Sequence, residues 1–440
     1  MGILVSKKEY LFLLLILVSS FVASCSEKTT VEKAEGSVSV QIPVQDSAES
    51  YNLKTVTLLG ISDLKTVAGE FVKFFYSPGS TGSELTGKAP VAHFAQTGAI
   101  FIPTDYISAQ MATIYYHLQN LAAFDDQVGA AGVNSWPRAV GLQTIIKEDD
   151  SYRKNNAFYD GQTDAMMFVP FTNEDLPISV NAGIIAHEHF HSLFYKLVLK
   201  SAVQSNKVLT NAASIHDGPP LILKTASKMQ TQNSELVEKA QLYNEAYLRG
   251  VNEGIADFWG WTYTEDVNFM KWSLPAYVGD RTLTLSDSDI GHYQTTTGIQ
   301  LQIANFQAES SEIHNSIMSY SYTVGTPHAR FLKMLTNVFA NETKVSVGQA
   351  KLKVAQDVIL FLKSLQQNLM ALKEDQSLEA DGLFQFMADQ QVKNKTLTDQ
   401  TCQFLVKYLN YSNDKAVVQC DHKDNQVVFT TATPSATAAK

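Results

Sequence analysis

The residue types best suited to chemistry lie in the segment Ile184–His191, which reads Ile-Ile-Ala-His-Glu-His-Phe-His. His187 and His191 are at positions i and i+4, so on a helix they lie on one face, where two imidazoles can share a metal ion. Glu188 is turned about 100° around the helix from the first histidine. A carboxylate there can act as a general base on a water whose pKa the metal lowers. The spacing therefore predicts a hydrolytic metal site, whereas His189 points away from that face and is expected to be structural.

A third ligand is expected from the segment Asn252-Glu253-Gly254-Ile255-Ala256-Asp257, which has the apolar pattern of a helix. Glu253 and Asp257 are also at i and i+4, so one carboxylate can bind the metal while the other accepts the free ring N–H of a metal-bound histidine. Two histidines and one glutamate with an open fourth position form a known type of catalytic zinc site. Glu245 is an alternative ligand, but no acidic residue lies four positions after it.

These motifs resemble, in their chain order, those of the thermolysin-like and fungalysin-like gluzincin peptidases. The segment Asn156–Tyr159 is similar to the edge strand that this family places beside its cleft. The resemblance implies that Asn156 and Ala157 bind the substrate backbone, because an extended peptide pairs with such a strand. It also implies a zinc endopeptidase that acts on proteins or peptides. The calcium sites of the family cannot be located, since no acidic cluster stands out.

The segment Glu312–Ile317 is similar to the family's downstream histidine segment, which implies that His314 stabilises the oxyanion of the transition state. This segment is one residue shorter than the family pattern between the histidine and the asparagine. Tyr320, Tyr322 and His328 are therefore alternatives. A separate departure is the long gap between the two ligand motifs, which implies an insertion at about 201–236.

The first residues have the pattern of an export signal: two lysines, an apolar run from Tyr10 to Val22, and then Ala23, Ser24 and Cys25. The end of this run looks like a bacterial lipobox, which implies that Cys25 is lipidated and that the chain is an exported lipoprotein of the outer membrane or cell surface. A plain secretory signal with a chance cysteine is the alternative. In an oxidising compartment Cys402 and Cys420 are expected to form a disulfide, although two unpaired buried thiols also fit.

The formal net charge is −10, and no dense basic block lies outside the extreme N-terminus. This charge argues against nucleic acid and anionic membrane surfaces as partners. We also expect a monomer that meets the membrane only through its lipid anchor. Two other functions remain open: a surface lipoprotein that binds without catalysis on the same fold, and a zinc exopeptidase.

The predicted fold class is α+β, of the zincin type, with a β-rich N-terminal lobe and a helical C-terminal lobe around the active-site helix. The predicted divisions are a signal peptide (1–24), a flexible tether (25–50), an N-terminal α/β lobe that ends in the HExxH helix (51–200), a mainly helical lobe (201–429) and a disordered tail (430–440). Helices are expected at about 105–125, 182–200, 233–263, 315–340 and 346–372.

Overall fold

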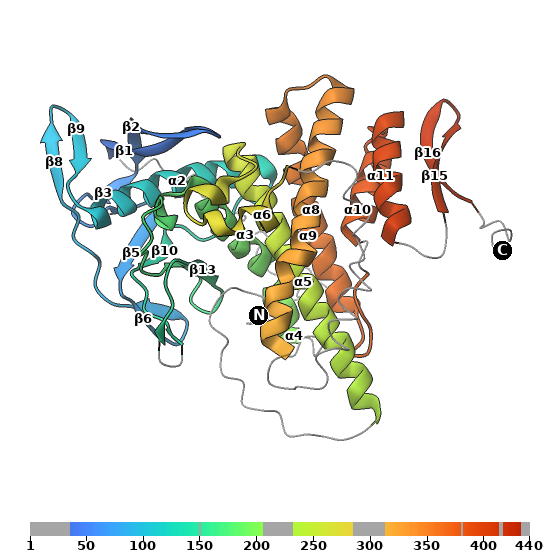
Figure 1. Ribbon diagram of the computed structural model, residues 1–440, viewed down its shortest axis with the longest axis horizontal. Coiled ribbons are helices and arrows are strands. Elements are labelled where there is room, and N and C mark those ends of the chain that lie inside the picture. The colour runs from blue at the N-terminus through green and yellow to red at the C-terminus, as the bar shows by residue number, and fades with distance from the viewer. Residues whose placement is uncertain are drawn as a thin grey trace, which may run out of the picture. The chain divides into compact units, whose positions relative to one another are not determined.

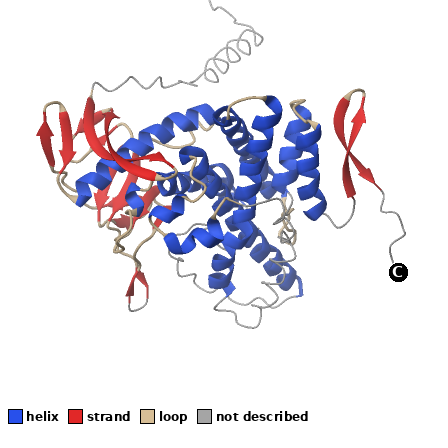
Figure 2. Ribbon diagram, turned by 45° about the horizontal axis from the view of Figure 1, so that its top comes forward, coloured by secondary structure: helices blue, strands red, loops and turns tan. Residues whose placement is uncertain are grey.

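The computed structural model describes residues 36–148, 151–205, 232–284, 313–379, 382–412 and 417–432. These residues form a mixed α+β fold, as predicted, in which strands dominate the first part of the chain and helices the rest (Figures 1 and 2). Within the described residues no helix is both long and apolar enough to span a membrane. The predicted signal peptide and Cys25 lie outside the described residues.

The first sheet has the strand order β2-β1-β9-β8. Its strands are β1 (Ser37–Ser47), β2 (Ser50–Leu59), β8 (Phe94–Thr97) and β9 (Ile100–Pro103). β1 pairs antiparallel with β2 and parallel with β9. The predicted tether at 25–50 is therefore wrong from residue 37 onward. Val38, Val40, Ile42 and Val44 alternate with other residues, and this period of two places Val40 and Ile42 in the core.

The second sheet has the order β13-β14-β10-β5. Its strands are β5 (Val72–Tyr76), β10 (Arg138–Leu142), β13 (Ala157–Asp160) and β14 (Ala165–Phe168). β5, β10 and β14 are parallel, and β13 is antiparallel to β14. The carboxyl ends of the three parallel strands and the start of β13 therefore share one edge, which we call the carboxyl edge.

Small hairpins are formed by β3 (Ile61–Asp63) with β4 (Ala68–Gly69), β6 (Gly79–Thr81) with β7 (Glu84–Thr86), and β11 (Lys147–Glu148) with β12 (Ser151–Tyr152).

Helix α2 (Tyr106–Val128) covers one face of the strands. Its start is capped by Asp105, whose side chain accepts a hydrogen bond from the backbone N–H of Ser108. Its end is at Gly129, which has a φ of 80° that a residue without Cβ adopts readily. This helix agrees with the prediction at 105–125.

The later helical segments include the four predicted at about 182–200, 233–263, 315–340 and 346–372, together with others that were not predicted. They are η1 (Ile178–Val180), α3 (Ala182–Phe194), the π-helical turn η2 (Tyr195–Leu199), α4 (Lys200–Ser205), α5 (Gln232–Thr264), η4 (Phe269–Trp272), η5 (Pro275–Tyr277), α6 (Val278–Arg281), α8 (Ile313–Thr343), α9 (Val347–Ala371), α10 (Gly382–Lys393) and α11 (Asp399–Ser412). Residues 206–231, which make up most of the predicted insertion, lie outside the described residues.

The C-terminal part ends in a hairpin of β15 (Val417–Lys423) and β16 (Gln426–Ala432), which the sequence analysis assigned to the helical lobe and the tail. The predicted disordered tail therefore begins too early, because residues 430–432 pair with residues 417–419 in this hairpin. A disulfide between Cys402 on α11 and Cys420 on β15 joins the hairpin to the preceding helix.

Helix α3 lies between two hydrophobic cores. Its first turns contribute Ile184 and Ile185 to the core around α2 and the sheets. Its last turns contribute Phe190 and Phe194 to the core of the later helices. All of its residues are buried. The helix that carries the histidine motif is therefore held on both sides by packing.

Candidate metal centre

The start of α3 is fixed by side chains from both parts of the fold. Asn181 caps the helix by accepting hydrogen bonds from two N–H groups of its first turn, and its amide donates to the Phe269 carbonyl at 2.9 Å and the Ser273 hydroxyl at 3.0 Å. The Tyr51 hydroxyl, from the β1–β2 hairpin, accepts from the Ala182 N–H at 3.0 Å. The rotation of the helix about its axis is therefore well determined.

Helix α5 approaches both α3 and α8 closely because glycines lie at the crossings. A Cβ on Gly260 would lie 2.9 Å from the carbonyl oxygen of Gly183 on α3. A Cβ on Gly254 would overlap the carbonyl oxygen of Gly325 on α8. Glu253 therefore lies on a stretch of helix that is fixed from two sides, and it faces the histidines of α3.

The structure brings His187, His191 and Glu253 together. The two Nε2 atoms are 3.1 Å apart, and carboxylate oxygens of Glu253 lie 3.4 Å from Nε2 of His187 and 3.9 Å from Nε2 of His191. All three side chains are buried, and one candidate ligand atom from each lies within 4.8 Å of the others. In a tetrahedral site with zinc–ligand bonds of about 2.0–2.1 Å, neighbouring ligand atoms are about 3.3–3.4 Å apart. The separations of 3.1 and 3.4 Å fit this geometry to within a few tenths of an ångström, and the separation of 3.9 Å, to the other carboxylate oxygen, is longer by about half an ångström.

The other ring nitrogens of the histidines have oxygen acceptors. Nδ1 of His187 lies 3.0 Å from Oδ1 of Asp257, and Nδ1 of His191 lies 3.0 Å from Oδ1 of Asn252. An N–H at each Nδ1 leaves the lone pair of Nε2 directed at the point between the three ligand groups. This is the tautomer that metal ligation requires. No role was predicted for Asn252, although it is part of the same motif as Glu253.

Glu253 provides a further test of fit. Both of its carboxylate oxygens are buried, and neither meets a donor with hydrogen-bond geometry among the described residues, although His187 and Arg281 lie 3.4 and 3.9 Å away. A buried carboxylate is costly unless a cation compensates it. Two imidazoles and one carboxylate form a donor set that suits zinc. The residues present therefore fit a bound zinc ion.

Arg281 is a residue of this centre that the sequence analysis missed. Its Nε and Nη2 atoms lie 3.1 and 2.5 Å from the two carboxylate oxygens of Asp257, and Nη2 lies 3.9 Å from Glu253. Its guanidinium also packs over the ring of Tyr322 at 4.2 Å. No motif marks this arginine, because it lies on the four-residue helix α6, 24 residues after Asp257.

These contacts set the charges of the centre. Burial would raise the pKa of Asp257, but Arg281 outweighs this effect and lowers it. Burial would likewise raise the pKa of Glu253, but His191 and His187 hold it below its usual range. Burial lowers the pKa of His191 to about 4, whereas for His187 the two carboxylates outweigh burial and raise the pKa to about 10. The carboxylates are therefore ionised at neutral pH, as metal ligation requires, and His187 would release a proton when a metal binds.

Three further acidic or imidazole side chains of α3 and α5 are not among the converging ligands: Glu188, His189 and Glu245. Glu188 is buried on α3 beside the first histidine. His189 lies with Nε2 3.0 Å from Asp125 on α2 and stacks on Trp136, in agreement with the structural role expected for it. Glu245 is buried on α5 but does not belong to the group of converging ligand atoms.

The structure places Ala157 at the start of β13, and Asn156 directly before it. β13 is the outer strand of its sheet among the described residues, and it lies against α3. The Tyr159 ring is 6.0 Å from the ring of Tyr195, at the end of α3. The carbonyl of Asn156 accepts from the N–H of Val169 at 3.1 Å. These two residues therefore lie on an edge strand beside the histidine helix.

The candidates for the transition-state donor lie on α8. His314 is in the first turn of α8, and its side chain, like that of Tyr320, lies outside what the structure describes. His328 is buried, its Nδ1–H donates to the carbonyl of Val324, and its ring stacks on Phe384. This alternative is a structural residue packed among aromatic rings. Tyr322, by contrast, lies against Arg281 next to the centre.

Comparison with known proteins adds no assignment to this geometry. No protein-family model matches the chain, and no curated protein matches it either.

Proposed function

We propose that the protein is a zinc-dependent endopeptidase with a gluzincin-type centre on a two-lobed zincin fold. The observation that carries this proposal is the convergence of His187, His191 and Glu253 from two buried helices, with separations close to those of a tetrahedral zinc site. Two further features support it: an acceptor on each Nδ1 atom, and a glutamate directly after the first histidine.

A zinc ion held by these three residues would polarise the scissile carbonyl and lower the pKa of the attacking water. Glu188 removes a proton from that water and delivers it to the leaving amine nitrogen. Asp257 keeps His187 in the required tautomer, and Asn252 does the same for His191. A protein that only binds a partner has no use for a base in this position, which favours catalysis.

The substrate is an extended polypeptide that pairs with the outer edge of β13, where Asn156 and Ala157 hold its backbone. His314 donates to the developing oxyanion, and Tyr322 is the alternative donor. No residues are assigned as ligands of a calcium ion. The protein works outside the cytoplasm as a monomer anchored through lipidated Cys25, and the disulfide of the C-terminal hairpin fits an oxidising compartment.

The test is cleavage of a diverse peptide mixture by the full-length protein in detergent, with the cut sites identified by mass spectrometry. Glu188→Gln and a zinc chelator serve as controls. Internal cuts that disappear in both controls would support the proposal. Release of terminal residues alone would make the protein an exopeptidase, and no cleavage by zinc-loaded protein would favour a binding protein without catalysis.

A further inference from the structure

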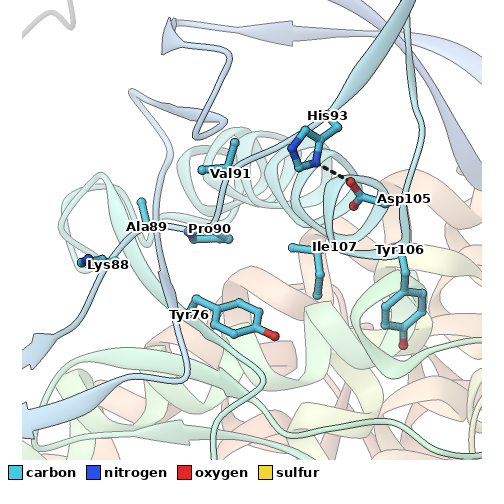
Figure 3. A pocket seen from close by; sticks show the side chains of 9 residues that line it. All are labelled: Tyr76, Lys88, Ala89, Pro90, Val91, His93, Asp105, Tyr106 and Ile107. Carbon is cyan, nitrogen blue, oxygen red and sulfur yellow. Dashed lines mark hydrogen bonds and ion pairs between the residues drawn. The ribbon is translucent and has the colours of Figure 1, made fainter.

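A groove of about 650 Å³ lies between the end of β5 and the start of α2, and no residue of the metal centre lines it (Figure 3). Its walls are mainly apolar and include Tyr76, Pro90, Val91, Tyr106 and Ile107. Figure 3 shows Ile107 between the two tyrosine rings. The exposed fractions of Tyr76, Val91 and Tyr106 are 46%, 45% and 44%, which is high for large apolar side chains. Three such side chains around one hollow indicate a binding surface.

The groove is preformed, because its walls are tied to one another and to regular elements. The Tyr76 N–H donates to the carbonyl of Lys88 at 2.9 Å. The backbone N–H of His93 donates to the hydroxyl of Ser108 on α2 at 2.7 Å, and its ring pairs with Asp105 at 2.7 Å. Tyrosine loses little conformational entropy on binding and offers both a ring face and a hydroxyl. The walls therefore suit a ligand that combines apolar groups with hydrogen-bonding groups, as a polypeptide does.

The position of the groove links it to the proposed substrate strand. Tyr76 ends β5, so the groove lies at the carboxyl edge of the second sheet, the same edge at which β13 begins. β10 and β14 lie between β5 and β13, so three strand spacings of about 4.8 Å separate them, about 14 Å in all. Ile145 and Tyr152 follow β10 in the chain, and their exposed fractions are 61% and 59%. These exposed side chains therefore follow the strand β10, which lies between β5 and β13.

We propose that this groove is an exosite, a second binding site that holds a distal stretch of the same polypeptide whose scissile bond lies at the metal centre. This inference rests on the proposed function. An extended chain rises about 3.3 Å per residue, so four or five residues span the 14 Å between β13 and the groove. Two tyrosines beside a proline suit proline-containing segments, which are already extended and lose little entropy on binding. The substrate class is therefore long, extended polypeptides, such as unfolded proteins, and not short peptides.

The experiment compares peptides that share one cut site found in the peptide mixture. One is short, and others carry about ten further residues rich in proline and tyrosine at either end. Because the groove lies beyond the start of β13, only one of the two extensions can reach it. For the full-length protein that extension should lower KM about tenfold, which corresponds to about 1.4 kcal/mol of added binding free energy, with kcat unchanged. Tyr76→Ser combined with Tyr106→Ser should remove this advantage.

Leu360→Ser is the matched control, because Leu360 is an equally exposed apolar residue on α9, outside the groove and the centre. A second readout is independent of turnover: binding of the labelled extended peptide to the Glu188→Gln protein, followed by fluorescence anisotropy. Equal KM or equal binding with and without the two tyrosines would overturn the exosite, even if both peptides are cut. Binding that depends on the tyrosines without any cleavage would instead refute the proposed peptidase activity and leave the groove as a peptide-binding site.

Discussion

Replacing Arg281 by methionine should weaken zinc binding without removing any zinc ligand. The guanidinium makes two hydrogen bonds to Asp257, at 2.5 and 3.1 Å, and Asp257 in turn holds Nδ1 of His187 at 3.0 Å. Loss of one partner of a buried ion pair costs about 3–5 kcal/mol, because the other charge stays buried. Partners that orient a metal ligand typically contribute a factor of about 10–100 to metal affinity. We therefore expect zinc affinity to fall by about 10–100-fold, together with a lower unfolding temperature.

The assay is competition for zinc with a chromophoric chelator, combined with thermal unfolding of the same samples. Arg138→Met is the matched control, because Arg138 is also a buried arginine that pairs with an aspartate, Asp164, at 3.0 Å. It should lower the unfolding temperature but leave zinc affinity unchanged. Unchanged zinc affinity in Arg281→Met, or an equal loss in Arg138→Met, would refute the argument that Arg281 acts through Asp257.

Two further predictions concern packing and pH. Gly254→Ala should lower the free energy of unfolding by about 3 kcal/mol and also weaken zinc binding, because the new Cβ would overlap the Gly325 carbonyl next to Glu253. The measurement is chemical unfolding, and the control is Gly279→Ala, because a Cβ on Gly279 meets nothing within 4 Å. Burial lowers the pKa of His117 to about 3 and of His328 to about 4, from 6.5 when unfolded. Each neutral buried histidine therefore contributes to the free energy of unfolding above pH 6.5. This contribution is lost as the pH falls to about 4, at about 1.4 kcal/mol per pH unit for each histidine. Between pH 6 and 5 the free energy of unfolding of His328→Gln should fall less steeply than that of the wild type, and equal slopes would contradict this.

The parts of the centre that the sequence predicted are those with a fixed spacing on one helix. His187 and His191 share a face of α3, and Glu253 and Asp257 share a face of α5, because side chains four residues apart are neighbours on any helix. The structure adds that the two faces meet. Sequence alone offered only a weak reason for this, since contacts between distant helices depend on packing such as the glycine crossings of α5.

The parts that could not be predicted lack such a spacing. Arg281 reaches Asp257 from a separate short helix, and only tertiary structure places it there. The tether prediction failed for a different reason: the alternation of Val38, Val40, Ile42 and Val44 was a readable strand signal, but the surrounding small and charged residues obscured it. The C-terminal hairpin was missed because its apolar residues come in short runs, Val417-Val418 and Val427–Phe429, and are at most partly buried.

The central claim is that His187, His191 and Glu253 hold the zinc ion, and its most direct test is the zinc content per chain of three proteins after equilibrium dialysis. The wild type and Glu245→Gln should each retain about one zinc ion, because Glu245 is a buried carboxylate on the same helix that lies outside the converging group. Glu253→Gln should retain almost none while remaining folded. Full zinc in Glu253→Gln, or loss of zinc in Glu245→Gln, would contradict the assignment.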